Sequence, residues 1–259
     1  MKLSIGVVSG LVIGVLIGLF LQPTSTPKPS PNLKAAVENH AAIVLASYED
    51  SKKDAEALVE AVKTFVNDPN PETHTAAKNA WLNAQESYGQ TEVYRFYGGP
   101  IDGENGPEGQ LNAWPLDESL IDYVETPANG GEQEQGVNII NSPESFPSIN
   151  KEVIAELNEY EGSETNVATG YHAVEFLLWG QDNYRVGTGS GDRSFTDYVI
   201  DGSGTNSNQD RRGQYLIAAA ELIVEGLSYL IDQWSMDGAY RSVFTSEDQL
   251  ERSFQKIIN

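Results

Sequence analysis

The sequence predicts an all-α protein, an antiparallel helical bundle with long loops, and three observations support this fold class. Apolar residues recur every three or four positions over long stretches, which is the period of an amphipathic helix. No convincing run alternates apolar and polar residues, as a half-buried strand would. Stretches rich in glycine and proline separate the periodic segments. With 259 residues, the chain is long enough for one large domain or two small ones.

The first segment differs from the rest of the chain. Residues 3–21 carry no charge and place a glycine at every fourth position, a pattern that lets membrane helices pack closely. A helix of this length measures about 28 Å, just enough to cross a bilayer core of about 30 Å. Residues 1–21 are therefore either an uncleaved membrane anchor or a signal peptide, and residues 22–31 form a Pro/Ser/Thr linker. Both readings bring this segment to the membrane and put the following domain outside the cytoplasm.

Helical periodicity and capping signals locate the main helices. Asn70 and Pro71 suit the N-cap and first turn of a helix, and Ser246 with Gln249 suits a capping box. Trp114 is the expected anchor of one or two helical turns between residues 111 and 124. The predicted helices cover about 32–66, 70–94, 148–160, the central stretch 170–182, about 215–234, and a last helix that ends in Ile257 and Ile258.

Two long segments contain little periodicity. Residues 96–150 contain no lysine or arginine but many acidic residues, glycines and prolines, and residues 180–209 are rich in glycine. Loops of this length inside a domain are usually functional or mobile. Asp102 begins an Asp-Gly-Glu-Asn-Gly run that resembles a calcium loop only superficially, because it lacks the EF-hand spacing.

The central stretch carries the most informative pattern. Between Tyr171 and Trp179 only His172 and Glu175 are ionisable, so this helix is expected to be buried nearly all round. Residues three positions apart lie on neighbouring turns of one helix face. Burying a lone carboxylate costs several kcal/mol unless a partner compensates. His172 and Glu175 therefore either satisfy each other and nearby groups, or together hold a cation.

Further metal ligands are expected to be carboxylates, because the chain has no cysteine and lacks the two-histidine helix of an HExxH peptidase. His40 lies in a core stripe and reads as a packed histidine, whereas His74 is expected to be exposed in a first helical turn. Imidazole with carboxylates suits iron, zinc or manganese. Glu92 is the best third ligand by helical phase, with a salt bridge to Arg95 as its alternative. Weaker candidates are Glu86, Asp102, Asp122 and Asp182.

The charge balance excludes some partners. A net charge of −22 argues against nucleic acid and against anionic membrane surfaces, since both repel an acidic protein. The same charge attracts cations and supports solubility.

Several blocks of the sequence resemble the imelysin family, which is also classed as the M75 peptidases. Residues 170–175, Gly-Tyr-His-Ala-Val-Glu, match its GxHxxE signature, and the stretch continues into Phe-Leu-Leu-Trp-Gly-Gln-Asp. Other blocks occur in the same order as in the family. They are Trp81 with Glu86, Tyr88 and Glu92; Asn112-Ala-Trp-Pro-Leu-Asp117 with Asp122; and Arg211-Arg-Gly-Gln-Tyr-Leu216.

This resemblance, which looks closest to the iron-regulated branch of the family, implies a helical protein of two bundle-like halves with a metal-linked site between them. On this basis residues 32–205 are expected to form the first bundle and residues 206–259 an incomplete second one, since relatives usually continue further. The resemblance also implies a role in iron acquisition, with an iron-transport membrane protein as a partner. Only some members are peptidases. We therefore expect a metal-binding protein, with iron favoured and zinc as the alternative, in preference to an M75 metallopeptidase or a structural surface protein without metal.

Overall fold

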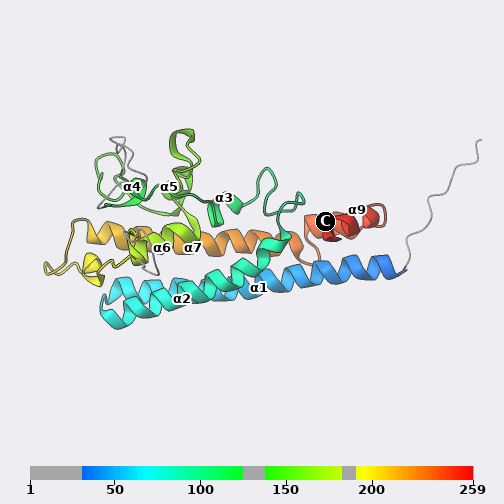
Figure 1. The fold of residues 1–259 in the computed structure, drawn as a ribbon, viewed down its shortest axis with the longest axis horizontal. Helices are drawn as coiled ribbons and strands as arrows, with labels where there is room; N and C mark the ends of the chain where they lie inside the picture. The colour runs from blue at the N-terminus through cyan, green and yellow to red at the C-terminus, as the bar shows by residue number, and fades with distance from the viewer. Residues whose placement is uncertain (1–30, 125–137, 183–190, 259) are drawn as a thin grey trace, which may run out of the picture.

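The computed structural model describes residues 31–124, 138–182 and 191–258, and this part of the chain contains helices and connecting loops but no strand (Figure 1). The predicted all-α fold is confirmed. The predicted anchor or signal peptide lies outside the described residues, as does the linker except for Pro31.

Three long helices lie side by side along the long axis of the molecule, and a shorter helix packs with them (Figure 1). The chain reverses direction between α1 and α2, and α7 also runs antiparallel to α1, as the bundle prediction requires. The four helices are α1 (Pro31–Asn67), α2 (Pro71–Gly89), α6 (Gly170–Trp179) and α7 (Gln209–Trp234).

The core lies between α1, α2, α6 and α7. Apolar residues recur every three or four positions along α1 and are buried there, among them Val37, Val44, Leu58 and Phe65. The apolar face of α7, from Tyr215 to Trp234, is covered by α1 and α6. Burial of such apolar side chains stabilises the fold by about 1.5–3 kcal/mol each. The apolar face of α7 is therefore covered by helices of the same chain.

The turn between α1 and α2 is fixed by a capping box. The Asn70 side chain accepts hydrogen bonds from the backbone N–H groups of Glu72 and Thr73, each at 3.0 Å, and Thr73 Oγ1 accepts one from Asn70 N at 3.2 Å. Pro71 occupies the first turn. The predicted start of this helix is confirmed. Its predicted end at residue 94 is corrected, because α2 ends at Gly89 and continues as a 3₁₀ segment, η1 (Gln90–Tyr94).

We expect Asn70→Ala to lower the free energy of unfolding by about 1 kcal/mol, because two helix N–H groups lose their acceptor. Urea denaturation of both proteins measures the difference. Asn79→Ala is the matched control, since Asn79 is exposed in the middle of α2 and alanine favours a helix interior. An equal loss of stability in both variants would contradict the capping role.

The segment between η1 and α6 forms short helices that pack on one side of the bundle (Figure 1). Trp114 was predicted to anchor this segment, but 69% of the Trp114 surface is exposed. Leu111 and Ile121 anchor it instead, since both are fully buried. The elements are α3 (Glu108–Leu111), α4 (Glu118–Ile121), α5 (Lys151–Glu156) and η3 (Tyr160–Gly162).

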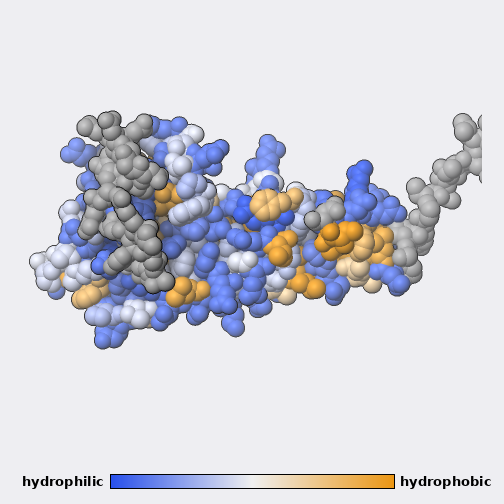
Figure 2. Space-filling model, viewed as in Figure 1, coloured by the Kyte–Doolittle hydropathy of each residue, from blue (hydrophilic) through white to orange (hydrophobic). Residues whose placement is uncertain are grey.

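After α6, the 3₁₀ segment η4 (Phe195–Tyr198) leads to α7, and the chain ends in α8 (Ala239–Phe244) and α9 (Leu250–Ile258). α9 packs along the N-terminal part of α1, and apolar side chains gather on the surface at this end (Figures 1 and 2). The predicted end of the last helix is confirmed. The predicted capping box at its start is wrong, because the Ser246 hydroxyl bonds the Val243 carbonyl and the Asp248 carboxylate.

By length and composition alone, one described stretch, Gln209–Phe244, could cross a membrane. Core helices of globular proteins meet the same two criteria, and α7 buries its apolar face in the bundle.

Candidate metal and ligand cleft

The two motif side chains project from one side of α6. His172 Nδ1 lies 3.2 Å from Glu175 Oε2, and the side chains are 20% and 44% exposed. The expectation that α6 is buried all round is therefore corrected. Its remaining apolar residues are buried except Trp179, which is half-buried, so the stripe of His172, Glu175 and Trp179 faces a cleft and not the core.

A cleft of about 450 Å³ lies beside this stripe, and we call it the tryptophan cleft. Its tryptophans come from three elements far apart in sequence, since Trp81 lies in α2, Trp114 in the loop after α3 and Trp179 at the end of α6. Trp81 and Trp179 meet edge to face at 5.3 Å between ring centroids, and Trp114 lies 4.8 Å from the His172 ring. The polar residues of the cleft are Glu118, His172, Glu175 and Asp182.

A second cavity of about 740 Å³ adjoins the first and shares Trp114, His172 and Glu175 with it. It is also acidic, because its lining adds Glu108, Glu159 and Glu164 against a single arginine, Arg95. The motif pair thus lies between two acidic hollows.

Glu118, on α4, also lines this cleft and was not among the predicted metal ligands. The pKa of its carboxyl is raised to about 7, mainly by burial and also by the negative charges of Asp117, Asp182 and Glu175, against the opposing effect of Arg193. A carboxyl group in this setting gains from any bound cation, because the cation compensates both the burial and the repulsion. Only the resemblance of residues 112–122 to a family block pointed to this segment.

The predicted third ligand, Glu92, lies elsewhere. It is exposed on η1, where its Oε1 accepts a hydrogen bond from Asn112 Nδ2 at 3.2 Å. The 3₁₀ turn that begins at Gln90 changes the helical phase on which its predicted position rested. The alternative, a salt bridge between Glu92 and Arg95, is wrong, because Arg95 Nη2 bonds Glu108 Oε1 at 2.9 Å.

The weaker candidates are dispersed. Asp182 lines the tryptophan cleft, whereas Glu86 is exposed on α2. Asp102 accepts hydrogen bonds from the backbone N–H groups of Phe96 and Gly99 and so organises a loop. Among residues 31–124, 138–182 and 191–258, no three His, Asp or Glu side chains are grouped closely enough to hold a metal ion. A single ion shared by His172, Glu175 and Glu92 stays a prediction.

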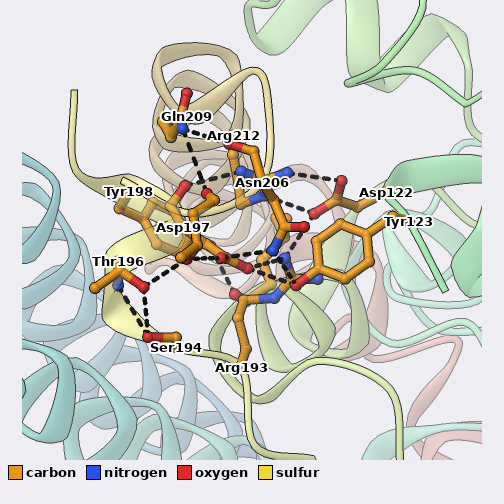
Figure 3. A network of polar contacts seen from close by, with 12 residues as sticks. Asp122, Tyr123, Arg193, Ser194, Thr196, Asp197, Tyr198, Asn206, Gln209 and Arg212 are labelled. Atoms are coloured by element: carbon orange, nitrogen blue, oxygen red, sulfur yellow. Dashed lines mark hydrogen bonds and ion pairs between the residues drawn. The ribbon is translucent and has the colours of Figure 1, made fainter. Parts of the chain in front are cut away.

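Asp122 belongs to a buried ion-pair network (Figure 3). Arg212 donates from Nε to its Oδ2 at 2.6 Å and from Nη2 to its Oδ1 at 3.0 Å, and Arg193 Nη1 donates to Oδ2 at 2.7 Å. All three side chains are no more than 1% exposed. Asp197 accepts from Tyr123 in the same network. The oxygens of Asp122 are thus occupied by arginines, and this residue holds the loops to α7.

The other two histidines, His40 and His74, are held by contacts within the protein. His40 packs against the rings of Tyr94, Trp234 and Phe244, as predicted for a packed histidine. His74 was expected to be exposed but is 93% buried, with Nε2 2.8 Å from the Leu178 carbonyl oxygen and its ring stacked on Phe65. Burial lowers the pKa of His74 to about 4. The sequence of α2 alone could not predict this contact of His74 with α6.

Comparison with known proteins identifies the family. The model of the imelysin family, peptidase M75, matches residues 44–259. The chain belongs to the imelysin family. A stretch of 75 residues is 35% identical to iron-regulated protein A of Synechococcus elongatus, covering 29% of this chain and 20% of that protein.

One solved structure has a similar fold. It is a Parabacteroides distasonis protein described as an iron-regulated protein A precursor. The TM-score is 0.57 at 18% identity, over 91% of this chain and 58% of that one. The chain thus spans little more than half the length of this relative. The resemblance inferred from the GxHxxE block is confirmed.

Proposed function

We propose that this imelysin-family protein is an extracytoplasmic metal-binding protein that takes a cation, iron by preference and zinc as the alternative, at His172 and Glu175. The observation that carries the proposal is the spacing of this pair. Two ligands about 2.1 Å from one ion lie about 3.0–3.4 Å apart at ordinary coordination angles. The Nδ1 and Oε2 atoms are 3.2 Å apart and face a cleft that two further carboxylates line.

The charge of the cleft supports a cation. Glu118, Glu175 and Asp182 line it, and its described lining includes no lysine or arginine. Water, or a changed side-chain position of Glu118 or Asp182, would complete a coordination shell that the motif pair begins. The names of the relatives, iron-regulated protein A, favour iron among the metals that suit imidazole and carboxylate. We accordingly place this protein in iron acquisition, together with an iron-transport membrane protein.

Two other functions remain as alternatives. A metallopeptidase needs an open metal position and a free general base, and Glu175 cannot easily be both ligand and base. A structural surface protein would use His172 and Glu175 only as a hydrogen-bonded pair. The exposed fraction of Glu175 weakens the structural alternative, because an exposed pair contributes little to stability.

We expect His172→Ala and Glu175→Gln to weaken iron(II) or zinc(II) binding by at least about tenfold, equivalent to about 1.4 kcal/mol. Calorimetric titration of the protein stripped with a chelator measures the affinity. Binding weakens as pH falls, since protons compete for the ligand lone pairs. Glu118→Gln tests the added carboxylate and Glu92→Gln the predicted third ligand.

Glu104→Gln is the matched control, because Glu104 is exposed and does not line either cavity. Metal affinity that stays unchanged in both motif variants would refute the metal proposal and leave the structural pair. Metal-dependent peptide cleavage that Glu175→Gln abolishes would instead support the peptidase.

A further inference from the structure

The tryptophan cleft concentrates the indole rings of this protein in one place. Three of its four tryptophans line the cleft, and the fourth, Trp234, is buried in the core at 1% exposure. Trp114 leaves 69% of its surface exposed, and Leu82, which also lines the cleft, leaves 52%. Large apolar side chains exposed together at a cleft are characteristic of binding surfaces.

The cleft combines these rings with negative charge. Glu118 and Asp182 lie in the same hollow as the three indoles, together with the motif pair. Indole faces attract a cation through the ring quadrupole, and cages of aromatic rings bind ammonium groups in this way. One such contact exists within the protein, where Lys78 Nζ lies 5.2 Å from the centre of the Trp179 ring. Lys78 does not itself line the cleft.

We propose that the tryptophan cleft binds an organic cation, an ammonium or guanidinium group on an apolar stem, between the indole rings and the carboxylates. The stem contacts Trp114 and Leu82, and the charged end lies toward Glu118 and Asp182. The volume of about 450 Å³ falls within the range of small-molecule sites. The ligand is either a free amine or a basic side chain of a peptide, which share this chemistry.

The charges allow the organic cation and the metal to be present together. Glu118, Glu175 and Asp182 can supply three negative charges. The inference rests on the same cleft as the proposed function, but the organic cation can be tested without the metal.

The test uses tryptophan fluorescence of the full chain, stripped of metal with a chelator. The probes are butylamine and an end-blocked Ala-Lys-Ala peptide, with 1-butanol and end-blocked Ala-Glu-Ala as their uncharged and acidic counterparts. We expect the two cations to give saturable changes at concentrations at least about tenfold below those of their counterparts. Added salt weakens the response, because exposed charges are screened.

Two variants test the residues. Trp114→Ala and Glu118→Gln are each expected to weaken butylamine binding by about five- to tenfold. The matched controls are Val243→Ala, at an exposed position on α8, and Glu104→Gln. Both are expected to leave butylamine binding unchanged. Equal binding of 1-butanol and butylamine overturns the inference, as does cation binding that Trp114→Ala leaves intact. Tighter binding of Ala-Lys-Ala than of butylamine identifies a peptide ligand, and the reverse a free amine.

The metal titration separates this inference from the proposed function. Amine binding that persists in a protein that binds no metal supports the organic-cation site and refutes the metal site. Metal binding without any response to butylamine or to Ala-Lys-Ala refutes the organic-cation site alone.

Discussion

Replacing Asp122 by asparagine is expected to lower the free energy of unfolding by about 3–5 kcal/mol, the cost of breaking a buried ion pair from one side. The change keeps the size of the side chain but removes its charge. Arg193 and Arg212 then keep their positive charges in a site where both are almost fully enclosed. Urea denaturation followed by circular dichroism measures the loss.

A surface ion pair provides the matched control. Lys63 Nζ lies 2.8 Å from Glu221 Oε1, with side chains 40% and 30% exposed. Glu221→Gln is expected to cost less than about 1 kcal/mol, because solvent screens such a pair. If Asp122→Asn costs no more than Glu221→Gln, the network in Figure 3 does not hold the loops to α7.

The same network adds stability that acid removes. Burial raises the pKa of Asp122, but the hydrogen bonds and charges of Arg212 and Arg193 outweigh it and hold the pKa below its ordinary value. A group whose pKa is lower in the folded state stabilises the protein above its unfolded pKa of about 3.9. This contribution is lost as pH falls through the folded pKa. Asp122→Asn lacks this contribution at every pH. The difference in unfolding free energy between the wild type and Asp122→Asn therefore narrows in strong acid.

Local sequence patterns predicted the helices well, because helix ends depend on neighbouring residues. Asn70 fixes the start of α2 through hydrogen bonds to residues two and three positions away, and Pro71 occupies the first turn. The period of α1 places the same residues in the core that the sequence indicates. These features need no knowledge of the rest of the chain.

The composition of the cleft was harder to predict, because it depends on contacts between segments distant in sequence. Glu118 reaches the motif pair from 54 positions before His172, and Trp81 donates from Nε1 to the Tyr171 carbonyl at 2.9 Å across 90 positions. No helical period relates such residues. The helical phase expected for Glu92 was wrong for a local reason, because a switch from α to 3₁₀ geometry leaves no clear signature in the sequence.

The glycine of the GxHxxE block, Gly170, occupies a position that the structure restricts to glycine. Gly170 has φ +84°, and a Cβ atom there would lie 2.4 Å from the Leu111 carbonyl oxygen. A methyl group at this position therefore meets both backbone strain and a backbone clash. Because Leu111 is fully buried, the carbonyl has little room to move away.

We expect Gly170→Ala to lower the free energy of unfolding by about 3 kcal/mol or more, which adds the cost of a left-handed conformation to that of an overpacked contact. Gly162→Ala is the matched control, since φ is +76° there but a Cβ would meet no atom within 4 Å. The control should cost about 1 kcal/mol, as strain alone does. Urea denaturation of both variants gives the difference, and equal losses would contradict the clash. Trp114 follows Leu111 by three residues and lines the cleft, so we also expect Gly170→Ala to weaken butylamine binding where Gly162→Ala does not.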